Sequence, residues 1–287
     1  MTKPELSVVA PVYNGAGSIG EFMRRTWEAL HQLGEPFEIL LVDDGSTDDS
    51  VEVMRAGLRQ CPGTSVIKLA ANCGQSNAIA AGLSQARGEY CVVMDSDLQD
   101  RPEDIPALYR AIAESDVDMV IASRSQANAS LVRNLASIAF YLAANHCTTV
   151  RNPRRAGVFR IIRGRCLGQV FAGPMRPGTV LSQLHAAGCT WRTIRLEREP
   201  RNDRRSGYSP RKLVMLALAR LLVFGRVPPR RLGGAGICVA LLLAARRKGF
   251  GGRLLAVLLL VVSLLLMDRR LLARFRPRFN IQSVITE

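Results

Sequence analysis

Short apolar runs alternate with segments of helical periodicity along the first half of the chain. The apolar runs are rich in β-branched residues and bounded by turn-forming residues, a pattern typical of buried strands. Between them, apolar residues recur three and four positions apart, as from Ile19 to Leu30, which indicates helices. Strands that alternate with such helices predict an α/β fold, with a mostly parallel sheet and helices on both faces. The predicted strands include residues 6–12, 37–42, 65–70, 118–122 and 158–162.

One further strand, at Val92 and Val93, runs directly into the carboxylates of Asp95 and Asp97. Two oxygen ligands at this spacing suit Mg²⁺ or Mn²⁺, which keep open positions for the oxygens of a diphosphate. Gln99 is a candidate third oxygen ligand. A bare Asp-x-Asp triplet is more often a polar turn, so the interpretation depends on its surroundings.

Those surroundings are two other polar loops, each at the carboxyl end of a predicted strand. Tyr13-Asn14 follows the first strand and Asp43-Asp44 follows the second. Ligands of parallel α/β sheets bind in the crevice at the carboxyl ends of the strands. The shared placement of the three loops therefore predicts one ligand site, built around the paired carboxylates.

The two halves of the chain differ strongly in charge. Of the net charge of +15, residues 1–150 contribute −8 (11 Lys+Arg against 19 Asp+Glu) and residues 151–287 contribute +23 (28 against 5). A basic half favours contact with phosphate, nucleic acid or anionic lipid. Because the basic segment has few interleaved aromatic residues and adjoins apolar runs, we expect phosphate and membrane lipid as its partners and no nucleic acid.

Two apolar runs, residues 232–245 and 254–267, lie near the C-terminus. Each has 14 residues, about 21 Å as a helix against a hydrocarbon core of about 30 Å. Basic residues flank both runs, and Ser263 is the one polar residue of the second, which predicts a short membrane hairpin. A re-entrant hairpin or a buried helix pair is the alternative. The predicted division is a catalytic domain at 1–211, an amphipathic juxtamembrane segment at 212–231, and the hairpin with a basic tail at 232–287.

The seven cysteines form no C-x-x-C pair, and no apolar leader precedes the first strand. A scattered, odd set of this kind indicates reduced thiols, not disulfides or a zinc site. Because no apolar leader precedes the first strand, we expect no signal peptide, and a catalytic domain on the cytoplasmic face of the inner membrane. Homo-oligomer formation is left open.

Four motifs occur in order along the predicted catalytic domain. They are residues 10–14 (APVYN), 42–48 (VDDGSTD), 72–78 (N-x-G-x-x-x-A) and 94–100 (MDSDLQD). In this combination the chain resembles the family 2 glycosyltransferases of GT-A fold, which have a Rossmann-like sheet. Within them it resembles the polyprenyl-phosphate glycosyltransferases, the dolichol-phosphate mannose synthase type. The resemblance is strong over residues 5–125 and returns at 204–209 and 276–279.

The resemblance implies a metal-dependent, inverting glycosyltransferase. The donor is a nucleotide sugar, expected to be a UDP-sugar, and the acceptor is a polyprenyl phosphate such as undecaprenyl phosphate. Mg²⁺ or Mn²⁺ is held by Asp95, Asp97 and Gln99, and Arg204 joins the two carboxylates in the catalytic set. Arginine suits this chemistry because a guanidinium binds phosphate through two parallel hydrogen bonds. The other implied donor- and acceptor-binding residues are Pro11, Val12, Tyr13, Asn14, Asp43, Asp44, Ser96, Arg124, Arg133 and Arg205.

Two departures from the family pattern leave alternatives open. Relatives carry an acidic residue in an Asp-x-x-Gly-x-Phe-Arg segment, whereas residues 151–160 here contain no carboxylate. Relatives also show Gly-Glu-Ser-Lys where residues 207–210 are Gly-Tyr-Ser-Pro. One alternative is a family 2 transferase whose acceptor is a glycan or a lipid headgroup. The other is a membrane-bound protein that binds a nucleotide sugar without turnover.

Overall fold

The predicted alternation of strands and helices is present in the structure, a computed structural model that describes residues 3–124, 156–172, 179–196 and 279–286. Every strand predicted from the sequence is confirmed, with ends that differ by one or two residues. The first part of the chain contains β1 (Leu6–Val12), α1 (Ala16–Leu33), β2 (Phe37–Asp43), α2 (Ser50–Gly57), β3 (Thr64–Leu69), α3 (Gln75–Gln85), β4 (Tyr90–Val93), α4 (Ile105–Ala113) and β5 (Met119–Arg124). The later part contains β6 (Ala156–Arg163), α6 (Gly164–Phe171), α7 (Val180–Ala186), β7 (Trp191–Leu196) and β8 (Ile281–Ile285).

The central strands are nearly continuous apolar runs because both of their faces are covered. Every residue of β1 is buried, and so is every residue of β2 after Phe37. α1 ends at Leu33 and is followed by Gly34, whose φ of +77° is a left-handed conformation that glycine adopts without strain. The helix α2 begins without a side-chain hydrogen bond from its N-cap residue. That residue is Asp49, and Asp48 accepts from the Ser50 amide instead.

The eight strands form one mixed sheet, in the order β7-β5-β6-β4-β1-β2-β3-β8. β1 pairs in parallel with β2 and β4, whereas β6 pairs antiparallel with both β4 and β5, and β8 pairs antiparallel with β3. The sequence predicts a mostly parallel sheet, and six of the eight strands run in one direction, with β6 and β8 as the exceptions. The direction of a strand depends on where the chain re-enters the sheet, which the strand's own hydrophobic pattern does not encode.

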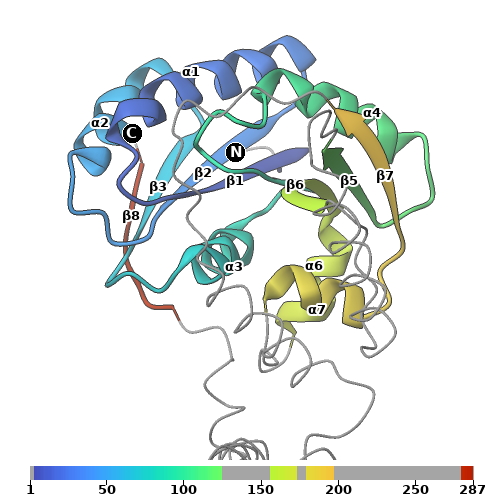
Figure 1. Cartoon of the computed structure of the whole chain (residues 1–287). Coiled ribbons are helices and arrows are strands. Elements are labelled where there is room, and N and C mark those ends of the chain that lie inside the picture. Colours follow the sequence, from blue (N-terminus) through green and yellow to red (C-terminus); the bar gives the residue numbers. More distant parts are fainter. Residues whose placement is uncertain (1–2, 125–155, 173–178, 197–278, 287) are drawn as a thin grey trace, which may run out of the picture.

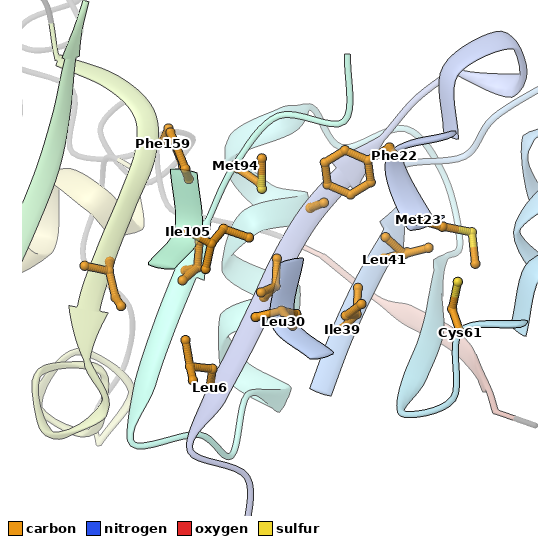
Figure 2. Packing of buried hydrophobic residues seen from close by; sticks show 14 of the residues in the cluster. Leu6, Phe22, Met23, Leu30, Ile39, Leu41, Cys61, Met94, Ile105 and Phe159 are labelled. Atoms are coloured by element: carbon orange, nitrogen blue, oxygen red, sulfur yellow. The ribbon is translucent and has the colours of Figure 1, made fainter. Parts of the chain in front are cut away.

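Two helical layers cover the two faces of the sheet (Figure 1). α1, α2 and α4 bury their apolar residues with one face of the strands, and α3, α6 and α7 bury theirs with the other. Figure 2 shows the first of these cores, in which Phe22 and Leu30 of α1 pack in one cluster with Ile39 and Leu41 of β2. A sheet buried on both sides holds the strand ends, and therefore the loops that follow them, in fixed relative positions.

The last strand, β8, comes from the C-terminal end of the chain and lies along β3 (Figure 1). The pairs are Val66↔Ile285 and Ile67↔Val284, and the amide of Ala70 donates to the carbonyl oxygen of Asn280 at 2.9 Å. The sequence pattern predicts only a basic tail there. β8 occupies the edge of the sheet opposite to β7, so the two outermost strands are both supplied by the second half of the chain.

Several predictions concern residues outside the described part of the chain. They are the juxtamembrane segment at 212–231 and the apolar runs 232–245 and 254–267. Within the described residues, no helix has both the length and the apolar character needed to cross a membrane.

Candidate functional site

The loops after β1, β2 and β4 meet at one edge of the sheet, as the sequence predicts. Ser96 Oγ, in the loop after β4, donates to the carbonyl oxygen of Pro11 at 2.9 Å. The amide of Asp44, after β2, donates to the carbonyl oxygen of Val12 at 2.8 Å. Ser18 Oγ, at the start of α1, donates to the carbonyl oxygen of Ser96 at 3.3 Å. The candidate residues of three separate motifs are therefore in direct contact.

Tyr13 and Asn14 form the turn after β1. The Tyr13 side chain is 52% exposed, which leaves its ring accessible to a ligand. Asn14 Oδ1 accepts from the Thr47 amide at 2.9 Å, and the Asn14 amide donates to Ser46 Oγ at 3.0 Å. Asn14 thus fastens the first loop to the second.

Two residues of this region hold a strained backbone. Among the described residues, Asn14 with φ +50° and Leu98 with φ +58° are the non-glycine residues in the left-handed region. Asparagine tolerates this conformation, whereas leucine rarely adopts it. Leu98 lies between Asp97 and Gln99, so the strain falls within the candidate metal-binding loop. Such outliers persist where the surrounding structure enforces them, and they cluster at functional sites.

The paired carboxylates of Asp43 and Asp44 have different environments. Asp44 Oδ1 accepts from the amides of Cys73 and Gly74 at 2.7 and 3.2 Å, and its Oδ2 accepts from Gly74 at 2.9 Å. Burial raises the pKa of Asp44, and these backbone hydrogen bonds oppose that rise. Asp43 is fully buried, and its Oδ1 accepts from the Ser46 amide at 3.1 Å. Its Oδ2 is buried and has no hydrogen-bond partner in the described part of the chain, which is uncommon for a buried polar atom.

Gly45 lets the loop after β2 approach the loop after β3, and replacing it should destabilise the fold. Its φ is +71°, and a Cβ added there would lie 2.7 Å from the amide nitrogen of Asn72. We expect Gly45→Ala to lower the free energy of unfolding by about 1–3 kcal/mol, measured by urea denaturation. Gly17→Ala is the control, because a Cβ on Gly17 meets no atom within 4 Å. Equal midpoints for the two variants would contradict the expected clash.

The residues after β4 fit a small divalent cation. Asp95 is half-buried and Asp97 is exposed, and both follow the strand end directly. The described residues contain no cluster of three or more His, Cys, Asp or Glu side chains that could hold a metal. Two carboxylates nevertheless suffice for Mg²⁺, which usually completes its coordination with water and substrate phosphates. Gln99 is 9% exposed, and its part as a third ligand stays a prediction.

The carboxylates of Asp95 and Asp97 are each held by a neighbouring amide. Asp97 Oδ1 accepts from the backbone amide of Gln99 at 3.1 Å. Asp95 Oδ1 accepts from Nε2 of Gln75, the first residue of α3. The sequence predicts no role for Gln75, although this residue lies inside the motif at 72–78. The motif places a helix start at the same sheet edge, and this is the signal that could have identified it.

Of the four arginines expected at the site, the structure describes only Arg124. Arg124 is the last residue of β5, which runs in the same direction as β4 and ends at the same edge of the sheet. Arg133, Arg204 and Arg205 lie outside the described residues. Their roles stay predictions.

Comparison with known proteins gives one family for this chain. The family described as Glycosyl transferase family 2 matches residues 7–171, which include all three loops of the candidate site. The match also includes β6 and α6.

Two relatives and one solved structure illustrate the similarity. The chain is 33% identical over 238 residues (83% of this chain, 70% of the relative) to an undecaprenyl-phosphate 4-deoxy-4-formamido-L-arabinose transferase of Pseudomonas savastanoi pv. phaseolicola. It is 44% identical over 143 residues (48% of this chain, 43% of the relative) to the protein of that name in Sodalis glossinidius. Glucosyl-3-phosphoglycerate synthase from Mycobacterium tuberculosis, solved with Mn²⁺, UDP-glucose and phosphoglyceric acid, has a TM-score of 0.54 at 17% identity. That alignment covers 77% of this chain and 78% of the synthase, and shows a shared fold.

Proposed function

Because the chain belongs to glycosyl transferase family 2, we propose that it transfers a sugar from a nucleotide sugar to a polyprenyl phosphate. The expected acceptor is undecaprenyl phosphate, since relatives that match most of the chain are named for transfer to it. The expected donor is a UDP-sugar. The observation that carries the proposal is the contact between the Asp95–Asp97 loop and the loops after β1 and β2, through Ser96 and Pro11.

The donor is proposed to lie across the carboxyl ends of β1, β2 and β4. Asp43 offers a buried, unpaired carboxylate oxygen to a base or ribose donor, and exposed Tyr13 offers an aromatic face. Asp44 already accepts three backbone hydrogen bonds, so it has room for one further donor from the nucleotide. Pro11, Val12 and Asn14 form the floor and the turn of this site.

Asp95 and Asp97, with Gln99, are the proposed ligands of Mg²⁺ or Mn²⁺. When bound, such an ion neutralises charge on the departing nucleoside diphosphate. The hydrogen bonds described above come from neutral amides, Gln75 on Asp95 and the Gln99 backbone on Asp97. These two amides add no positive charge that would compete with a cation for the site. Solved proteins of similar fold contain Mn²⁺ or Mg²⁺, which supports the proposal.

The acceptor phosphate is an anion near neutral pH, so its attack needs no strong general base. The work left to the protein is to position the two substrates and to stabilise the leaving group, with inversion at the anomeric carbon. Arg124, Arg133, Arg204 and Arg205 are proposed to bind the acceptor phosphate and the diphosphate. Residues 232–245 and 254–267 are proposed to hold the catalytic domain at the cytoplasmic face of the membrane, where the acceptor lies.

The proposal is tested by transfer of radiolabelled sugar from a panel of UDP- and GDP-sugars to undecaprenyl phosphate, with Mn²⁺ or Mg²⁺. The full chain in detergent should give a chloroform-soluble labelled product that disappears with EDTA. Nucleotide binding without a lipid product would favour a glycan or headgroup acceptor, to which the carboxylate-free segment at 151–160 already points. Release of the full chain from carbonate-washed membranes would contradict the membrane hairpin.

A further inference from the structure

The first residue of α3 reaches the candidate metal-binding loop. Gln75 Nε2 donates to Asp95 Oδ1 at 2.5 Å. A carboxylate can only accept hydrogen bonds, so the amide nitrogen must face Asp95. Gln75 is exposed and Asp95 is half-buried, so this bond lies at the surface of the crevice where the donor is proposed to bind.

The loop that presents Gln75 is itself held by a residue of the nucleotide site. Asp44 accepts from the amides of Cys73 and Gly74 in three hydrogen bonds of 2.7–3.2 Å. On the other side, Asn77 Nδ2 donates to the carbonyl oxygen of Cys73 at 2.7 Å. Gly74 turns the chain into α3 with a φ of +88°. The start of the helix is therefore fixed relative to the loop after β2, and so is Gln75.

These contacts connect the two halves of the proposed donor site. We infer that Gln75 is a positioning residue, which orients the Asp95 carboxylate toward the cation, and that Asp44 supports it by fixing the loop at 73–74. The inference rests on the proposed function and deepens it. A hydrogen bond on Oδ1 fixes the rotation of the carboxylate, as residues behind metal ligands commonly do. Glutamine suits this task because it donates a hydrogen bond without adding a positive charge beside the cation.

The experiment measures Mn²⁺ affinity of the full chain in detergent with saturating UDP, by electron paramagnetic resonance of free Mn²⁺. Gln75→Met removes the donor at nearly constant size. We expect its Mn²⁺ dissociation constant to rise about tenfold, within the range found when partners of metal ligands are removed. Gln85→Met is the matched control at the other end of α3, where the exposed side chain donates a hydrogen bond to its neighbour Ser84. It should stay within about twofold of wild type, because it leaves Asp95 untouched.

A purely structural role for Gln75 would give a different result. Positioning predicts that excess Mn²⁺ restores most of the transfer rate of Gln75→Met, and that the variant melts at the wild-type temperature. It also predicts that Gln75→Met weakens Mn²⁺ binding no further in an Asp95→Ala background. Wild-type affinity in Gln75→Met, or a lower melting temperature without rescue by Mn²⁺, would overturn the inference and leave the proposed function standing. If wild type with UDP binds no Mn²⁺, both the inference and the metal-dependent mechanism fail.

Discussion

Asp97→Ala is expected to lower the rate of sugar transfer by on the order of 10²–10³-fold, the usual effect of removing one preorganised electrostatic group from an active site. The reason is the loss of one of the two carboxylates after β4 that are proposed to hold the cation. The fold should be unaffected, because Asp97 is exposed and its one described hydrogen bond is to the Gln99 amide. The measurement is the initial rate of lipid-linked product formation, with the melting temperature recorded for each variant.

Asp116→Ala is the control for Asp97→Ala. Asp116 is also an exposed carboxylate, but it precedes β5 and so lies at the amino edge of the sheet, away from the site. Its removal changes the net charge of the chain by the same amount and should leave the rate within about twofold of wild type. A rate for Asp97→Ala close to that of Asp116→Ala would refute the assignment of the site to the loop after β4.

Glu38→Ala is expected to produce the largest loss of stability, about 3 kcal/mol, because it removes the acceptor of two hydrogen-bond donors inside the protein, each of which costs about 1–3 kcal/mol when left unsatisfied. Glu38 is 5% exposed, and its Oε1 accepts from Ser7 Oγ at 2.6 Å and from the Arg87 amide at 2.8 Å. Its Oε2 accepts from the Arg87 guanidinium at 2.7 Å. Alanine would leave the Ser7 hydroxyl and the Arg87 amide without their acceptor inside the protein. Urea denaturation of the wild type and of Glu38→Ala gives the difference in their free energies of unfolding.

Arg87→Ala separates the buried hydrogen bonds from the ion pair. The Arg87 side chain is 62% exposed, so its charge is screened by water and contributes about 1 kcal/mol or less. Because Arg87→Ala keeps the backbone amide, both buried donors keep the Glu38 acceptor. We expect this variant to lose at most a third of what Glu38→Ala loses. Equal losses would mean that the ion pair, and not the buried hydrogen bonds, is what matters.

The strands that the sequence predicts well are those buried on both faces. β1 and β2 are apolar at nearly every position and end in polar residues, so their ends and the loops of the site follow from the pattern alone. The sequence does not predict β7, because half of its residues are exposed and none is fully buried, with Arg192 and Arg195 among the exposed ones. β8 has a similar surface and pairs with a strand more than two hundred residues earlier in the chain. Local periodicity carries no signal for such a pairing.

The sequence predicts which loops form the site, but not which residues of those loops contact one another. The sequence groups Asp43 and Asp44 as one pair, whereas in the structure Asp43 accepts from the Ser46 amide of its own loop and Asp44 accepts three hydrogen bonds from residues 73–74. Which member of an Asp-Asp pair faces which neighbour depends on the approach of another loop, and here Gly45 decides how close that approach is. Gln75 was missed for the same reason, because its partner Asp95 is twenty positions away.

The pairing of β8 with β3 places the C-terminal strand and β7 at the two outermost positions of one sheet. Seven strand spacings of about 4.8 Å separate these positions, about 34 Å in all. One sheet cannot lie on both sides of a bilayer, so β7 and β8 share the side on which the loops of the candidate site lie. The edge strand thus fixes, for residues 281–285, the face of any membrane at which this end of the chain is found.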